Sequence, residues 1–240
     1  MKTQTLKLLL LLLMSGTVLM AQSPSKFQRA GSTRAPSDKQ SLKNSPLATS
    51  TGSYDEMDSR GIKGTAYLNP QFIEGSLIFT NGDRLDKKPL RYNLYTQQFE
   101  MIEDSDTLAI GNAAEIEYLR IADKVFVYTD YLCQGKHKSG YFELLEEGDC
   151  RLLKRWVATY HEIDPSGSST VADDCFYRDC QCFIQFFKNP ATAVSSSKKE
   201  LIRSFANKGE EVKAYMKQEK LKAKREADLI KIVDYYNSIQ

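Results

Sequence analysis

The chain has 240 residues, and its 33 lysines and arginines are almost balanced by 31 aspartates and glutamates. This balance excludes the strongly basic footprint of a dedicated nucleic-acid binder, so we expect no nucleic-acid partner. Five cysteines, all after residue 130, are too few and too uneven in number to indicate a disulfide scaffold.

The N-terminus, residues 1–21, has the pattern of a secretory signal peptide. Lys2 and Lys7 precede an unbroken leucine run, Leu8–Leu13, and small residues follow before Gln22. The apolar stretch is too short to cross a bilayer about 30 Å thick, so we predict cleavage and no transmembrane segment. We expect an exported protein in the periplasm, on the outer-membrane surface or secreted.

The segment 22–60 is rich in Ser, Thr, Lys and Pro, and its few apolar residues are too scattered to form a face. Such a segment cannot bury enough surface to offset its chain entropy. We therefore predict a disordered linker here and a folded region that begins near residue 61.

Short apolar runs alternate with turn residues over 61–194, a pattern typical of an antiparallel β domain. Asn81-Gly82 follows the β-prone run Ser76–Thr80 and is the strongest two-residue hairpin signal. The spacing of about 8 to 12 residues, without helical periods, predicts a meander that closes into a sandwich, roll or barrel. Further strands are expected at Leu90–Tyr95, Phe99–Ile102, Thr107–Ile110, Glu115–Leu119, Lys124–Tyr131, Gly140–Leu145 and Leu152–His161.

The period changes to that of helices over 195–240. Ser197 and Glu200 have the spacing of a capping box, and apolar stripes at helical spacing follow as far as Tyr236. We predict two or three short amphipathic helices that cap the β domain, which makes the fold class α+β. Residues 198–226 hold ten Lys or Arg against five Glu. This excess indicates either a solvated face or a surface for an anionic membrane or acidic partner.

The residues that usually carry catalysis are sparse. His137 and His161 are the only histidines, and Asp164-Pro165 stands where a zinc-protease motif beginning at His161 would need its second histidine. The sequence has no nucleophile elbow, phosphate-binding loop or dinucleotide fingerprint. We therefore assign no catalytic residue, metal or cofactor.

Cys175, Cys180 and Cys182 form a C-x4-C-x-C cluster that lacks the usual zinc spacing. A disulfide, inert thiols and a metal site remain the alternatives. If Arg178-Asp179 is a two-residue turn between strands, Cys175 lies directly opposite Cys182. We predict a disulfide between these two residues.

Side-chain character alternates along residues 90–95, so the two sets should lie on opposite faces of a strand. We expect Leu90, Tyr92 and Leu94 in the core. The opposite set is either a solvated sheet face or the candidate binding surface that we favour: Arg91, Asn93 and Tyr95.

Several strings resemble a family of uncharacterised exported proteins of Bacteroidota. They are G-T-A-Y-L-N at 64–69, P-L-R-Y-N-L-Y at 89–95, G-Y-F-E-L-L at 140–145 and Y-Y-N at 235–237. The resemblance covers about residues 64–240. It implies no established activity, so no catalytic residue follows from it, and the cysteine cluster is not part of its pattern.

The expected function is that of an exported cell-envelope protein that binds another envelope protein or a small ligand without catalysing a reaction. The alternative is an envelope hydrolase or isomerase whose site is assembled from dispersed polar residues. A third interpretation is a sensor or adaptor that uses the basic helices. A pocket holding His161 or Arg91 beside a carboxylate would favour the enzyme, and a filled interior would favour binding.

Overall fold

The computed structural model describes residues 48–50, 62–162 and 174–240. The expected signal peptide lies outside the described residues, and so does the expected linker except for Ala48–Ser50. These three residues form strand β1, which pairs with another strand, so at this point the structure differs from the predicted linker. No helix within the described ranges is long and apolar enough to cross a membrane.

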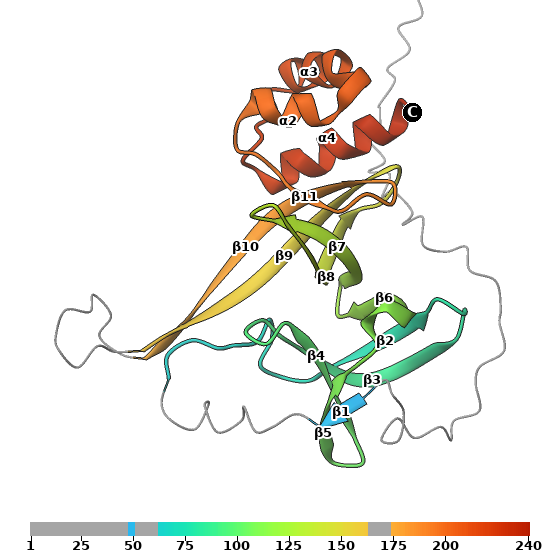
Figure 1. Cartoon of the computed structure of the whole chain (residues 1–240), viewed down its shortest axis with the longest axis vertical. Helices are drawn as coiled ribbons and strands as arrows, with labels where there is room; N and C mark the ends of the chain where they lie inside the picture. Colours follow the sequence, from blue (N-terminus) through green and yellow to red (C-terminus); the bar gives the residue numbers. More distant parts are fainter. Residues whose placement is uncertain (1–47, 51–61, 163–173) are drawn as a thin grey trace, which may run out of the picture. The chain divides into compact units, whose positions relative to one another are not determined.

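An antiparallel sheet of eleven strands is followed by three short C-terminal helices (Figure 1), which confirms the predicted α+β class with a helical cap. Two short 3-10 helices are η3 (Ala113–Glu115) and η4 (Ala206–Lys208). The strands are β1 (Ala48–Ser50), β2 (Ile73–Phe79), β3 (Arg84–Asn93), β4 (Gln98–Glu103), β5 (Asp106–Ile110), β6 (Ile116–Ile121), β7 (Lys124–Cys133), β8 (Lys136–Glu146), β9 (Cys150–His161), β10 (Cys175–Phe186) and β11 (Thr192–Ala193). The helices are α2 (Lys198–Ser204), α3 (Gly209–Gln218) and α4 (Glu226–Ser238).

The strand order is β1-β5-β4-β3-β2-β6-β7-β8-β9-β10-β11. Neighbours in sequence are neighbours in the sheet, as in a meander, with two exceptions: β1 pairs with β5, and β6 pairs with β2 instead of β5. The hairpin at Asn81-Gly82 is confirmed: Gly82 has φ 88°, and the Phe79 amide donates to the Asp83 carbonyl at 2.9 Å. Glycine suits this turn because it adopts a positive φ without strain.

The largest apolar core is built from side chains of β2 to β10 and contains a cluster of stacked and edge-on aromatic rings. Leu90, Tyr92 and Leu94 are each at most 1% exposed within it, which confirms their predicted side of the strand. Tyr92 stacks on Phe99 with ring centroids 4.3 Å apart. Rings packed in this way add to the stabilisation from burial alone.

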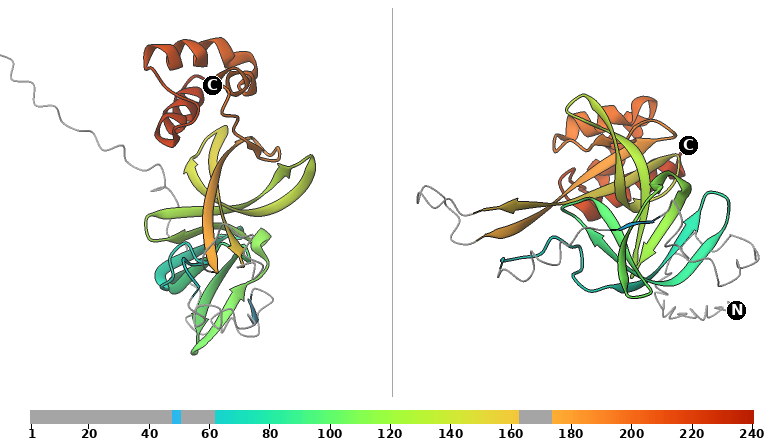
Figure 2. Two further views of the ribbon diagram at one scale, coloured as in Figure 1. Left: turned by 90° about the vertical axis from the view of Figure 1, so that its left-hand side faces the viewer. Right: turned by 60° about the horizontal axis from the view of Figure 1, so that its bottom comes forward.

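A second core joins the helical cap to the sheet (Figure 2). Leu152 of β9 and Ile184 of β10 pack with Leu201, Val212 and Ile232, one from each helix. The apolar stripes predicted from sequence therefore face the sheet, because helices of this length need tertiary packing to be stable.

A third core includes Phe142, Leu153 and Phe183. It lies on the face of β9 and β10 opposite the second core, since Leu153 and Phe183 are next to Leu152 and Ile184 along their strands. The chain after β10 returns to β7, where Ala191 bridges Tyr131.

Strand β10 corrects one prediction. Residues 175–186 pair with β9 without interruption, and Arg178 and Asp179 lie opposite Ala158 and Val157. The predicted turn at Arg178-Asp179 is therefore wrong, and the argument for a Cys175–Cys182 disulfide fails with it. Both residues lie on one extended strand, seven residues or about 23 Å apart, and on opposite faces. All five cysteines are free in the structure.

Candidate functional site

Two of the three predicted binding residues are buried. Arg91 is 7% exposed and Asn93 is fully buried, whereas Tyr95 is 42% exposed. The Arg91 guanidinium donates to Glu100 Oε2 from both Nε, at 2.9 Å, and Nη2, at 2.7 Å. Asn93 donates to the other carboxylate oxygen of Glu100 at 3.1 Å.

This network lies under side chains from the segment that precedes β2. The Arg91 guanidinium is 3.8 Å from the ring centroid of Tyr67 and 4.3 Å from that of Phe72. Arg91 and Asn93 do share a face opposite Tyr92, but that face is covered. Their arrangement joins β3 and β4 to the covering segment and leaves Tyr95 as the accessible residue of the three.

Tyr95 belongs to an aromatic group at the end of the sheet where β9 ends and β10 begins. Its ring meets Phe176 edge-on at 5.6 Å, and Phe176 in turn contacts Tyr160 at 5.3 Å. On the other face of this hairpin the exposed Tyr177 contacts His161 at 4.9 Å. The second histidine, His137, is exposed on β8.

A second polar cluster lies on β7, β8 and β9. Glu143 is nearly buried, and both of its carboxylate oxygens accept a bond at 2.6 Å, one from Lys124 and the other from Trp156 Nε1. Lys154 lies directly opposite Glu143, stands 4.1 Å from the Trp156 ring centroid and pairs with Glu226 of α4 at 2.7 Å.

The pKa values of Lys154 and Cys182 in this cluster are both raised. Burial lowers the pKa of Lys154, but the hydrogen bond and charge of Glu226 outweigh burial and hold that pKa above its ordinary value. Cys182 lies opposite Lys154, and its pKa is raised to about 11, first by burial and then by the charge of Glu226. At neutral pH the amine stays charged and the thiol stays protonated, so neither group is prepared for proton transfer.

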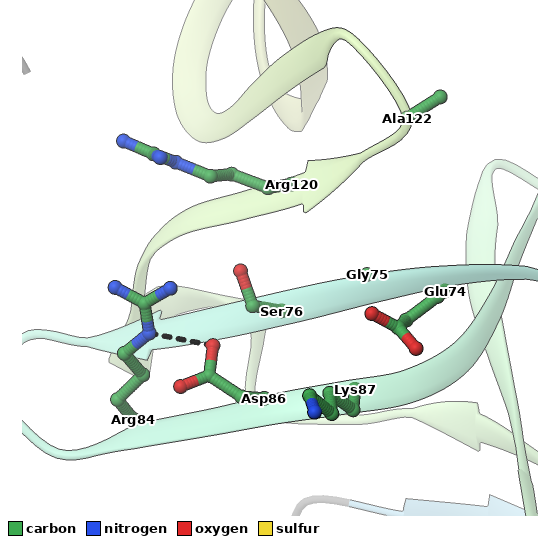
Figure 3. Close-up of a pocket in the computed structure, with 8 residues that line it drawn as sticks. All are labelled: Glu74, Gly75, Ser76, Arg84, Asp86, Lys87, Arg120 and Ala122. Atoms are coloured by element: carbon green, nitrogen blue, oxygen red, sulfur yellow. Dashed lines mark hydrogen bonds and ion pairs between the residues drawn. The ribbon is translucent and has the colours of Figure 1, made fainter.

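A third polar region is open to solvent. A depression of about 420 Å³ lies on β2, β3 and β6 (Figure 3). Leu77 and Leu119, which are next to Ser76 and Arg120 in their strands, belong to the largest core, so the depression lies on the other face of the sheet. Ser76 stands on the central strand β2, directly opposite Arg120 of β6, and Arg84 and Asp86 stand on β3. The lining residues are Glu74, Gly75, Ser76, Arg84, Asp86, Lys87, Arg120 and Ala122.

A β-bulge shapes this depression. The register of β2 with β3 shifts between Gly75 and Leu77, so that Asp86 and Lys87 together face the single residue Ser76. Lys87 has φ 53°, a left-handed conformation that glycine adopts far more readily than lysine. The bulge therefore places two charged side chains at the rim at some cost in backbone strain, which is common at functional sites.

The Arg84–Asp86 ion pair in the depression is short, at 2.6 Å, but both side chains are about half exposed. Exposed pairs contribute little to stability, so this pair can exchange its bonds for those of a ligand at small cost. Gly75 has a structural role beside it, since a Cβ there would lie 2.3 Å from the Arg120 carbonyl oxygen.

The sequence did not predict this depression. Residues 84–89 were not predicted as part of a strand, and the pairing of β2 with β6, which brings Arg120 to Ser76, is a non-local contact. No group of three or more His, Cys, Asp or Glu able to hold a metal occurs among the described residues.

Comparison of the chain with protein-family models, with curated proteins and with solved structures gave no match. The resemblance to exported Bacteroidota proteins therefore stays a prediction, and the functional argument rests on geometry.

Proposed function

We propose that this chain is an exported cell-envelope protein that binds a partner protein or small ligand and catalyses no reaction. The contact surface in this proposal is the depression on β2, β3 and β6. The observation that carries the proposal is the bulge that holds Asp86 and Lys87 opposite Ser76, because it supplies accessible charge at a strained backbone position.

The other polar clusters support the same proposal. Glu100 and Glu143 have both carboxylate oxygens bonded to protein groups, and Lys154 is paired with Glu226. Groups saturated in this way stabilise the fold and have little bonding capacity left for a substrate. In the depression, by contrast, the charged side chains of Arg84, Asp86 and Lys87 are exposed to solvent.

An envelope hydrolase or isomerase remains the alternative. Its supporting observation is Arg91 beside the Glu100 carboxylate at 2.7 Å, the pairing expected for such a site. Tyr67 and Phe72 cover this pair, and it does not line the depression.

Photocrosslinking in the native envelope tests the proposal. We would place a photoreactive residue at position 84 in the depression and, as a control, at the exposed position 136 on β8. We expect a discrete crosslinked product from position 84 that is lost when Arg120→Glu is added. Equal labelling from positions 84 and 136 would overturn the proposed surface.

A further inference from the structure

The connection between α3 and α4 carries the densest positive charge in the helical cap. Residues 217–225 read K-Q-E-K-L-K-A-K-R, with five basic residues and one acid. Lys217, Lys220, Lys222, Lys224 and Arg225, here called the basic ridge, are all exposed.

Buried side chains fix the shape of the basic ridge. Leu221 and Ala223, each 7% exposed, alternate with the lysines and point into the core between the helices and the sheet. The Lys222 amide donates to Asp228 Oδ2 at 3.0 Å. Alternation therefore puts Lys220, Lys222 and Lys224 on the outer side of an anchored segment.

The backbone at Lys220 is unusual for a lysine. The Leu221 amide donates to the Met216 carbonyl at 2.9 Å, the bond that ends a helix in a Schellman motif, and Lys220 has φ 55°. Glycine is the favoured residue at such a position. The chain thus keeps a lysine where glycine would be less strained, which is what we expect if the charge itself is used.

The four lysines of the basic ridge are not neutralised locally, whereas Arg225 is within ion-pair distance of Asp228. No ion pair within the described part of the chain joins Lys217, Lys220, Lys222 or Lys224 to a carboxylate. Glu226 instead pairs with Lys154. Asp228 is occupied by the Lys222 amide and lies 3.8 Å from Arg225.

We propose that the basic ridge docks the protein on an anionic phospholipid surface. Clusters of four to eight basic residues attract anionic lipid headgroups, and a surface of this kind requires only projecting charge. Acidic peptide motifs are usually recognised by clusters of arginines, whereas the ridge has four lysines and one arginine, and its apolar side chains point inward and offer a peptide no groove. This surface is separate from the depression on β2, β3 and β6, and either can be active without the other.

Sedimentation with lipid vesicles tests the docking. The full mature chain would be mixed with vesicles of phosphatidylcholine alone or of phosphatidylcholine with phosphatidylglycerol. We expect binding to the anionic vesicles only, weakening as salt is added because screening shortens the reach of the charges. The proposal would be overturned if the wild-type protein did not bind anionic vesicles, or if it bound both kinds of vesicle equally.

Two triple variants with the same change in charge supply the control. Lys220→Glu, Lys222→Glu and Lys224→Glu together should lower the affinity for anionic vesicles at least about 100-fold, because losing each lysine costs roughly fivefold and each added glutamate repels the surface. Lys136→Glu, Lys138→Glu and Lys188→Glu change exposed lysines on β8 and after β10 and should have a much smaller effect. Equal losses from both triple variants would show a general charge effect and contradict the assignment of the ridge.

A single substitution separates docking from folding. Lys220→Gly removes one charge and relieves the left-handed backbone, so the variant should unfold at a higher temperature yet bind anionic vesicles about fivefold more weakly. A more stable variant with unchanged affinity would contradict the proposal. Binding to soluble polyglutamate without binding to vesicles would identify an acidic protein partner instead.

Discussion

Arg91 and Glu100 form a buried ion pair whose side chains are only 8% and 3% exposed. Removing two charges from water is costly, and the cost is recovered here by three hydrogen bonds to one carboxylate. The pair therefore acts as a unit, and losing one member leaves the other charged and uncompensated.

Glu100→Gln should lower the free energy of unfolding by about 3 kcal/mol, because Arg91 then stays buried without a counter-charge. Urea denaturation measures this change. Arg84→Gln, which breaks the half-exposed pair with Asp86, is the control and should cost less than about 1 kcal/mol. Similar losses from the two variants would mean that Arg91 reaches water in solution.

Two buried tyrosines of the aromatic core differ in whether their hydroxyl is hydrogen-bonded. The Tyr141 hydroxyl is buried without a hydrogen-bond partner among the described residues, whereas the Tyr92 hydroxyl donates to Gln97 at 3.4 Å. Burial raises the pKa of both groups above the ordinary value. An unsatisfied buried hydroxyl is destabilising.

Tyr141→Phe should therefore raise the free energy of unfolding by about 1 kcal/mol, and Tyr92→Phe should lower it by about 0.5 to 1 kcal/mol. Thermal and urea unfolding of the two variants give the comparison. A loss of stability in Tyr141→Phe would show that its hydroxyl is bonded in solution.

The thiols should differ in reactivity, since the thiolate is the reactive form. Burial raises the pKa of Cys150 to about 12, and the pKa of Cys182 is raised to about 11, while Cys180 is exposed. In native protein at pH 8, iodoacetamide should modify Cys180 first and leave Cys150 and Cys182 largely unmodified. Labelling of Cys182 should accelerate as the pH rises toward about 11.

The same shift has a consequence for stability. The folded state holds the Cys150 proton more tightly than the unfolded state, whose pKa is near 9, so stability should fall as the pH rises from about 9 toward 12.

Peptide mapping without reductant should recover all five thiols after unfolding. A Cys175–Cys182 link would show that β10 is broken at Arg178-Asp179.

At the scale of elements, the sequence predicted the strands from β2 to β9 to within a few residues, except that β3 begins at Arg84 and not at Leu90. Alternation and turn signals are local properties, which is why most of these strands could be predicted. It failed at β10, where Asp179 resembles a turn residue but pairs with Val157 along the continuous hairpin. Long-range pairing overrode local propensity there.

The candidate site was predictable to the same limited extent. The sequence placed Arg91 and Asn93 on the correct face of β3, but nothing local indicates that Tyr67 and Phe72 cover that face. The bulge at Lys87 likewise depends on how β2 and β3 pair, and lysine is not a residue that signals a left-handed position.

The Asn237 side chain of helix α4 is hydrogen-bonded to the backbone at the start of β9. Asn237 accepts a bond from the Cys150 amide and donates one to the Cys150 carbonyl, both at 2.9 Å. Asn237→Ala leaves both backbone groups unsatisfied and should cost about 2 kcal/mol in urea unfolding. Ser238→Ala, exposed and one residue away, should cost less than about 0.5 kcal/mol. Equal effects would mean that water replaces the amide.

At the scale of the whole described structure, one sheet packs against three apolar cores. The ion pair of Lys154 and Glu226 joins β9 to α4 beside the core that holds the helices. Charges beside this core restrict how the helices can dock, because any other register would bury them without partners.

Strand β1 bears on how much of the chain the sheet requires. Ala48, Thr49 and Ser50 pair with Ile110, Ala109 and Leu108 of β5, whose side chains are nearly buried. Without β1 this strand becomes an exposed edge with unpaired backbone groups, and exposed edges favour self-association.

A chain that begins at Ile62 should therefore unfold about 2 to 4 °C below one that begins at Ala48, the shift expected for roughly 1 kcal/mol in a protein of this size. The shorter chain should also elute as a mixture of monomer and oligomer in size-exclusion chromatography. Thr49→Pro in the longer chain separates the pairing of β1 from the other deleted residues, since proline cannot donate to the sheet. If the shorter chain matches the longer one in melting temperature and stays monomeric, β1 adds nothing to the sheet and the predicted linker extends through residue 60.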